Sequence, residues 1–162
     1  MNDSAEHEIR PITLSDAGEV LTLQRAAFTQ EALIYGDPDM PALTQSLDEL
    51  AAELRDNLGC VAVIGGRIVG AARARAAGAL LLVGRIAIAP DVQGEGIGSD
   101  LLEAVESRGR DAGCREAELF TGSFSEANIA LYERLGYRET ERVDQGDGVA
   151  EVYLRKDIAE RA

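Results

Sequence analysis

The chain has 162 residues and a formal net charge of −13 at pH 7, with 46% hydrophobic and 28% charged residues. This length and balance predict one folded domain over residues 1–162 and exclude a disordered or fibrous protein. The acidity argues against a nucleic-acid partner, because phosphate backbones are bound by clustered Lys and Arg, and it is typical either of a surface that maintains solubility or of one that steers a cationic substrate.

The N-terminal part predicts a strand followed by a helix. Residues 7–13 alternate enough to form a strand, which Pro11 confines to a sheet edge or to the strand's beginning. Ser15 and Asp16 are capping residues, and apolar residues recur after them at helical spacing. These apolar positions are Val20, Leu21, Leu23, Ala27 and Phe28.

A loop and a second helix should follow. Segment 35–44 contains two prolines and a glycine, which predicts an ordered loop rather than a continuous helix. Ser46 and Glu49 form a capping-box pattern, so we expect a helix over 47–57.

The middle of the chain has the pattern of strands. Residues 60–64 and 67–77 predict a hairpin, because Gly65-Gly66 supplies the positive φ angles of a tight turn. A third apolar run, 79–90, ends at Pro90. A glycine-rich loop follows at 93–98 and opens into a helix over about 99–112.

The C-terminal part alternates again between strands and a helix. We expect a strand over 116–121, a helix over 125–135 with Ser125 as its cap, and a final hairpin of strands near 137–143 and 149–155. This order predicts an α+β (mixed α/β) domain whose central, mostly antiparallel twisted sheet is flanked by helices.

The loop Gln93–Ser99 is the most specific local feature. Small residues let backbone N–H groups approach a ligand, and the helix behind them adds partial positive charge at its N-terminus. The combination favours a phosphate or pyrophosphate, although the glycines alone are also compatible with a structural turn. The loop lacks the GK[ST] of a P-loop and the G-x-G-x-x-G spacing of a dinucleotide fold.

Three blocks of sequence together resemble the GNAT (GCN5-related N-acetyltransferase) superfamily. Gln93–Gly98 matches its Q/R-x-x-G-x-G/A loop, and Arg85–Pro90 is similar to its splayed strand. The stretch from Asn128 to Tyr137 matches its N-x-x-x-Y-x-x-x-G-[FY] pattern. The match in order and spacing covers roughly residues 80–140, and the resemblance implies the GNAT fold and binding of acetyl-CoA.

The resemblance also implies roles for individual residues. Tyr132 would be the general acid that protonates the departing coenzyme A thiolate, although a Tyr on an apolar helix face is often only part of the core. Asn128 would reach the cofactor near the thioester, with a capping role as the alternative. Residues 86–88 would contact the pantetheine arm through their main chain, and 94–99 would hold the pyrophosphate. The implied cofactor-binding residues are Ile86, Ala87, Ile88, Gln93, Gly94, Glu95, Gly96, Ile97, Gly98, Ser99 and Asn128.

A general base cannot be carried over from the family. Many relatives have a Glu on the splayed strand, but residues 84–88 contain no carboxylate. Glu31, Tyr35 and Asp37 are candidates for the wall of the acceptor pocket, while each also fits a solvated or capping role. A water relay, or an acceptor that arrives neutral, would make a protein base unnecessary.

The resemblance therefore implies transfer of an acetyl group to a primary amine by direct attack in a ternary complex. The acceptor can be a small molecule or a peptide or protein amine, and the sequence does not identify it. The alternatives are an acyl-CoA-binding sensor or assembly module without catalysis, and a protein that binds another phosphorylated ligand. The sequence leaves the oligomeric state open, and analogy with relatives suggests a homodimer through the C-terminal strands as one arrangement.

Location and metal binding are predicted from what the sequence lacks. No stretch reaches the roughly 20 apolar residues of a membrane span, and the N-terminus lacks the features of a signal peptide, so we expect a cytoplasmic protein with no membrane partner. Cys60 and Cys114 lack CxxC spacing, and His7 is the single histidine. We therefore expect two buried thiols and no metal site.

Overall fold

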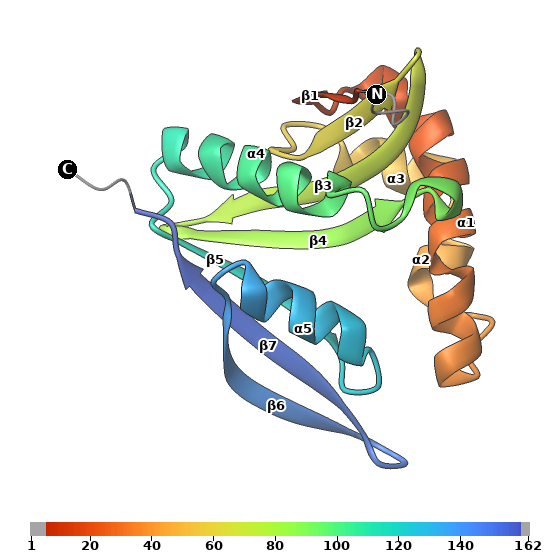
Figure 1. Ribbon diagram of the computed structural model, residues 1–162, viewed down its shortest axis with the longest axis vertical. Helices are drawn as coiled ribbons and strands as arrows, with labels where there is room; N and C mark the ends of the chain where they lie inside the picture. Colours follow the sequence, from red (N-terminus) through yellow and green to blue (C-terminus); the bar gives the residue numbers. More distant parts are fainter. Residues whose placement is uncertain (1–5, 160–162) are drawn as a thin grey trace.

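The computed structural model describes residues 6–159, which form a seven-stranded sheet and five α-helices (Figure 1). The strands are β1 (Glu8–Pro11), β2 (Cys60–Ile64), β3 (Arg67–Ala77), β4 (Leu80–Ile88), β5 (Glu116–Gly122), β6 (Arg138–Gly146) and β7 (Val149–Asp157). The helices are α1 (Ala17–Tyr35), α2 (Pro41–Thr44), α3 (Leu47–Glu53), α4 (Ile97–Asp111) and α5 (Glu126–Arg134).

The sheet has the strand order β1-β2-β3-β4-β5-β7-β6. Neighbouring strands pair antiparallel except β4 and β5, which are parallel. The predicted fold class, a mixed α+β domain with a mostly antiparallel sheet flanked by helices, is confirmed. The proline-containing strand β1 lies at a sheet edge, as its sequence predicts.

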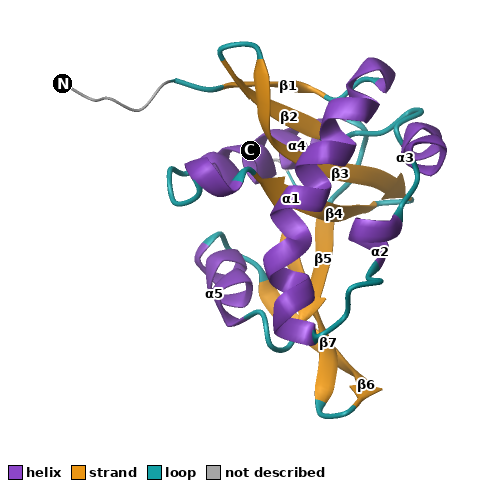
Figure 2. Cartoon of the chain, turned by 90° about the vertical axis from the view of Figure 1, so that its right-hand side faces the viewer, coloured by secondary structure: helices purple, strands orange, loops and turns teal. Residues whose placement is uncertain are grey.

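Helices cover both faces of this sheet. A Cβ placed on Gly70 of β3 would lie 2.9 Å from Ile97 and Leu101 of α4. Arg73, three residues further along β3, points to the opposite face and donates a hydrogen bond to Gln24 of α1 at 2.7 Å. Figure 2 shows α5 on one side of the sheet and α2 and α3 on the other.

Aliphatic side chains make up most of the core, as expected for a chain that is only 4% aromatic. Helix α4 approaches β4 closely through Gly109, where an added Cβ would lie 2.6 Å from the Leu81 side chain. Cys60 and Cys114 are buried and unbridged, which confirms their prediction as buried thiols. Among residues 6–159, no helix combines the length and the apolar composition that a membrane crossing requires.

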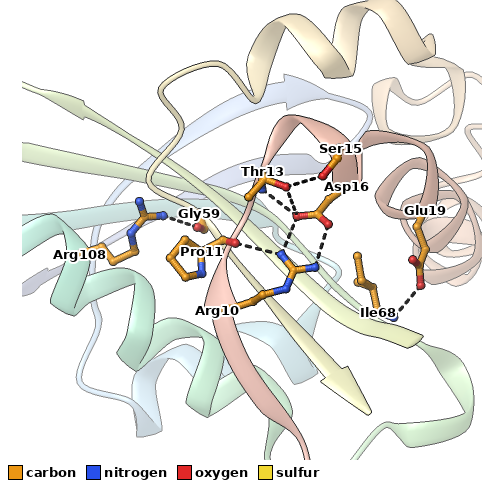
Figure 3. A network of polar contacts seen from close by, with 9 residues as sticks. All are labelled: Arg10, Pro11, Thr13, Ser15, Asp16, Glu19, Gly59, Ile68 and Arg108. Carbon is orange, nitrogen blue, oxygen red and sulfur yellow. Dashed lines mark hydrogen bonds and ion pairs between the residues drawn. The ribbon is translucent and has the colours of Figure 1, made fainter. Parts of the chain in front are cut away.

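A polar network fixes the start of α1 against β1 (Figure 3). The Asp16 carboxylate accepts two hydrogen bonds from the Arg10 guanidinium, at 2.8 and 2.9 Å, and one from the Thr13 amide at 2.8 Å. The Arg10 side chain holds the pKa of Asp16 below its usual value. The expected capping is therefore only partly correct: Asp16 precedes α1, but its side chain and that of Ser15 bond to Thr13 rather than to α1 amides.

The segment between α1 and β2 differs from its prediction. The expected loop 35–44 contains the short helix α2, which starts at Pro41, and α3 ends at Glu53 rather than near residue 57. The side chain of Asn57 ends this segment by accepting hydrogen bonds from the amides of Gly59 and Ala74. The predicted capping box of α3 is confirmed, with both of its hydrogen bonds present.

The sheet splits at the strand that the sequence places before the glycine-rich loop. Pairing between β4 and β5 covers only Leu80–Leu82 with Glu116–Glu118. Beyond these residues the two strands diverge (Figure 1). Arg85 has a φ of 50° where the β3–β4 register shifts, which bends β4 away from its neighbour. This divergence leaves β4 main-chain groups without β5 partners at the centre of the sheet.

Candidate active site

A cleft of about 500 Å³ lies where β4 separates from β5. Its walls are the second half of α1, the end of β4, the glycine-rich loop with the start of α4, and the start of α5. The three sequence blocks that resemble GNAT proteins therefore meet at one cleft, although they span about fifty residues of sequence.

The glycine-rich loop presents backbone N–H groups to this cleft. Gly94 and Gly96 have φ angles of 82° and 84°, which side-chain-bearing residues rarely adopt, and an added Cβ on either would meet nothing within 4 Å. Helix α4 begins at Ile97, two residues earlier than predicted. Within residues 6–159, the amides of 96–99 donate no hydrogen bond to a protein acceptor. These unpaired donors, at the N-terminus of a helix that lines the cleft, fit an anionic diphosphate.

Most of the predicted cofactor-binding residues line the cleft, but two of them do not. Ile86 and Ile88 line the cleft, whereas the Ala87 side chain is 3% exposed and belongs to the core. Glu95 is exposed and does not line the cleft. Among the other predicted cofactor residues, those lining the cleft are Gln93, Gly94, Gly96, Ile97, Gly98, Ser99 and Asn128.

Tyr132 on α5 lines the same cleft and is only 7% exposed. Burial, with a contribution from the charge of Glu31, raises its pKa to about 12. Its hydroxyl has no hydrogen-bond partner among the residues that the structure describes. The phenol is therefore protonated at neutral pH and remains free to donate to a ligand in the cleft.

A hydrogen-bonded chain of three side chains connects α1 to the start of α5. The Ser125 hydroxyl donates to Glu31 Oε2 at 2.7 Å and lies 2.7 Å from the Tyr35 hydroxyl. Because the single Ser125 proton goes to the carboxylate, Tyr35 donates to Ser125. Asn128 Nδ2 also donates to Glu31, at 3.4 Å.

The three predicted substrate-binding residues lie in different places. Glu31 lines the cleft, Tyr35 contacts it through Ser125, and Asp37 lies outside it, accepting a hydrogen bond from the Asp39 amide at 3.1 Å. No sequence pattern indicates the role of Ser125. This residue precedes α5 as expected, but its hydroxyl binds Glu31 and makes no capping hydrogen bond.

Comparison with known proteins identifies the family that the three sequence blocks resemble. The sequence model of the acetyltransferase (GNAT) family matches residues 19–137, which is well over half of the chain. No curated protein matches the sequence.

Solved structures of similar fold include PaiA N-acetyltransferase from Thermoplasma acidophilum in complex with coenzyme A, at 17% identity and a TM-score of 0.78, covering 94% of this chain and 99% of that one. The ribosomal-protein-S18-alanine N-acetyltransferase from Escherichia coli is 20% identical, with a TM-score of 0.78 and 97% of each chain covered. YncA from Salmonella typhimurium, solved with acetyl-CoA, is 20% identical, with a TM-score of 0.77, and covers 98% of this chain and 97% of that one. At these identities the likeness establishes the fold.

Proposed function

The chain belongs to the GNAT family of acetyltransferases, and from this premise we propose that it transfers an acetyl group from acetyl-CoA to a primary amine by direct attack in a ternary complex. One observation carries the proposal. The amides at the start of α4, which have no acceptor within residues 6–159, line the same cleft as Tyr132, beside the part of β4 that is not paired with β5.

The residues of the cleft fit the diphosphate and the pantetheine arm of acetyl-CoA. The amides of 96–99 bind the diphosphate, with Gly94 and Gly96 allowing close approach of the backbone. The β4 main chain around Ile86 and Ile88, unpaired on its β5 side, hydrogen-bonds the pantetheine arm. When bound, acetyl-CoA supplies an acetyl group that is activated as a thioester.

Two side chains move the protons of the reaction. Tyr132 donates its phenolic proton to the departing thiolate. Because its pKa is raised to about 12, the phenol keeps this proton at the pH values at which an amine is neutral and able to attack. Glu31 accepts the proton of the attacking amine, directly or through water, since it is the predicted base candidate whose carboxylate lines the cleft. Ser125 and Asn128 orient that carboxylate.

The test is a continuous assay of thiol release with acetyl-CoA and a panel of small amines, amino acids and peptides. We expect turnover with at least one class of amine. A protein that binds coenzyme A tightly but releases no thiol with any acceptor would instead be a non-catalytic sensor or assembly module. The absence of a carboxylate from residues 84–88 of β4 is the reason for considering this alternative.

Three features of the protein's context stay predictions. These are a single domain spanning residues 1–162, whose ends lie outside the described residues, a cytoplasmic location, and a homodimer through the C-terminal strands. Sedimentation of the purified chain would test the dimer.

A further inference from the structure

A second cavity, of about 570 Å³, lies beside the part of β4 that precedes the cleft-lining residues. Leu82, Gly84 and Arg85 of β4 line this cavity, whereas Ile86 and Ile88 line the cleft. The parallel pairing of β4 and β5 ends at Leu82 and Glu118, and both residues line the second cavity. The two cavities therefore follow one another along β4, and the second lies where the pairing of β4 with β5 ends.

The second cavity is rich in arginine, although the chain as a whole is strongly acidic. Four arginines and three carboxylates line it, in a protein with 16 basic and 29 acidic residues. Two of the carboxylates are already paired: Glu53 with Arg73 at 3.0 Å, and Glu118 with Arg155 at 2.8 Å. Arg73 also donates to Gln24, so its role is to hold α1 against β3.

Arg85 differs from Arg73 in having no partner. Within residues 6–159 its guanidinium makes no hydrogen bond or ion pair, and its Nε is buried. Arg73 and Arg85 line the same cavity. Burial lowers the pKa of Arg73 to about 10, the charge of Arg85 adds to this shift, and Glu53 opposes it. The Arg85 backbone is also in the left-handed region, which is unfavourable for a side-chain-bearing residue.

Arg85 is only half-buried, but its buried Nε has no acceptor within residues 6–159 and its guanidinium lies in a cavity with other cations, an arrangement that an anion would stabilise. Carboxylates are suited to this role because they accept two parallel hydrogen bonds from one guanidinium. Phe120 and Tyr153, whose ring centroids are 5.2 Å apart, supply an apolar wall to the same cavity. An acceptor with an apolar body and a carboxylate would use both features.

We propose that the second cavity receives the acceptor and that Arg85 binds a carboxylate on it, so that the substrates are amines bearing a carboxylate, such as amino acids or acidic peptides. This inference rests on the proposed function for the position of the amine, which reaches the cleft through the opening between β4 and β5. The binding of the carboxylate itself needs neither acetyl-CoA nor turnover.

The test is calorimetry on the protein without cofactor, using N-acetyl-L-phenylalanine and its amide, together with the corresponding glycine and leucine pairs. We expect each carboxylate to bind about ten- to a hundredfold more tightly than its amide, because hydrogen bonds to charged groups are worth this much. Arg85→Gln should abolish the preference. Arg138→Gln, which changes an exposed arginine outside both cavities, should leave it intact.

Equal affinity for acids and amides, no detectable binding of either, or a preference retained in Arg85→Gln would overturn the inference. Coenzyme A binding measured on the same samples reports separately on the proposed function and shows that the Arg85→Gln protein is folded. If transfer is fastest with neutral amines while coenzyme A binds normally, the substrate class is wrong and the proposed function stands.

Discussion

Replacement of Tyr132 by Phe removes one oxygen atom and separates catalysis from packing. Without the donor, expulsion of the thiolate loses its proton source, and kcat should fall about 10²- to 10⁴-fold, or about 3–5 kcal/mol of barrier. The Tyr132 hydroxyl makes no hydrogen bond to the residues that the structure describes. We therefore expect the free energy of unfolding to change by less than about 1 kcal/mol and the affinity for coenzyme A to change little.

Tyr137→Phe is the matched control, since the two rings are neighbours with centroids 6.3 Å apart. The Tyr137 hydroxyl donates to Glu106 at 2.8 Å, and both residues are buried. Its removal leaves a buried carboxylate short of a donor and should lower the free energy of unfolding by about 1–3 kcal/mol. Because Tyr137 does not line the cleft, kcat should remain close to that of the wild type.

The assays are thiol release at saturating acetyl-CoA, calorimetry with coenzyme A, and unfolding in urea. The expected result is a double contrast: Tyr132→Phe slow but stable, and Tyr137→Phe active but less stable. If Tyr132→Phe keeps kcat within threefold of the wild type, the phenol is not the proton donor. If both variants lose kcat equally, the loss reflects packing around α5 rather than chemistry.

Gly96→Ala places a side chain at a φ of 84°, and the strain together with the altered loop should weaken coenzyme A binding by about tenfold in calorimetry; unchanged affinity would argue against the loop as the diphosphate site. Asp16→Asn removes a nearly buried partner of Arg10 and should lower the free energy of unfolding by about 1–3 kcal/mol in urea. Folding lowers the pKa of Asp16, so the stability that its carboxylate contributes is fully present above the unfolded-state pKa of about 4 and is lost as the pH falls through the lower folded-state pKa. The free energies of unfolding of wild type and variant should therefore converge in acid, and a constant difference between them would contradict this. Gly109→Ala forces a methyl group against Leu81 and should destabilise the protein by about 1–3 kcal/mol, seen as a lower urea midpoint, while a stabilised variant would show that α4 moves freely away from β4.

The sequence predicted those elements of the fold whose signals are local. The predictions of the Ser46–Glu49 capping box and of the Gly65-Gly66 turn are both confirmed, because each feature is specified within a few neighbouring residues. Helix α2 was missed since four residues show no helical period.

In the candidate site, too, local features could be predicted from the sequence and long-range contacts could not. The loop and Tyr132 were found through linked motifs, and the structure brings them to one cleft. The contact between Glu31 and Ser125 joins residues 94 positions apart, so no sequence spacing could reveal it. The conformation of Arg85 depends on the register shift between β3 and β4, which is likewise a property of the assembled sheet.

The central claim is that the amides at the start of α4 bind the diphosphate of the cofactor. Its most direct test is an NMR titration of the ¹⁵N-labelled protein with coenzyme A and, separately, with pantetheine, which lacks the diphosphate. Coenzyme A should shift the amide signals of Gly96, Ile97, Gly98 and Ser99 strongly, and pantetheine should leave them nearly unchanged. Saturation with coenzyme A that leaves these four signals in place would contradict the claim.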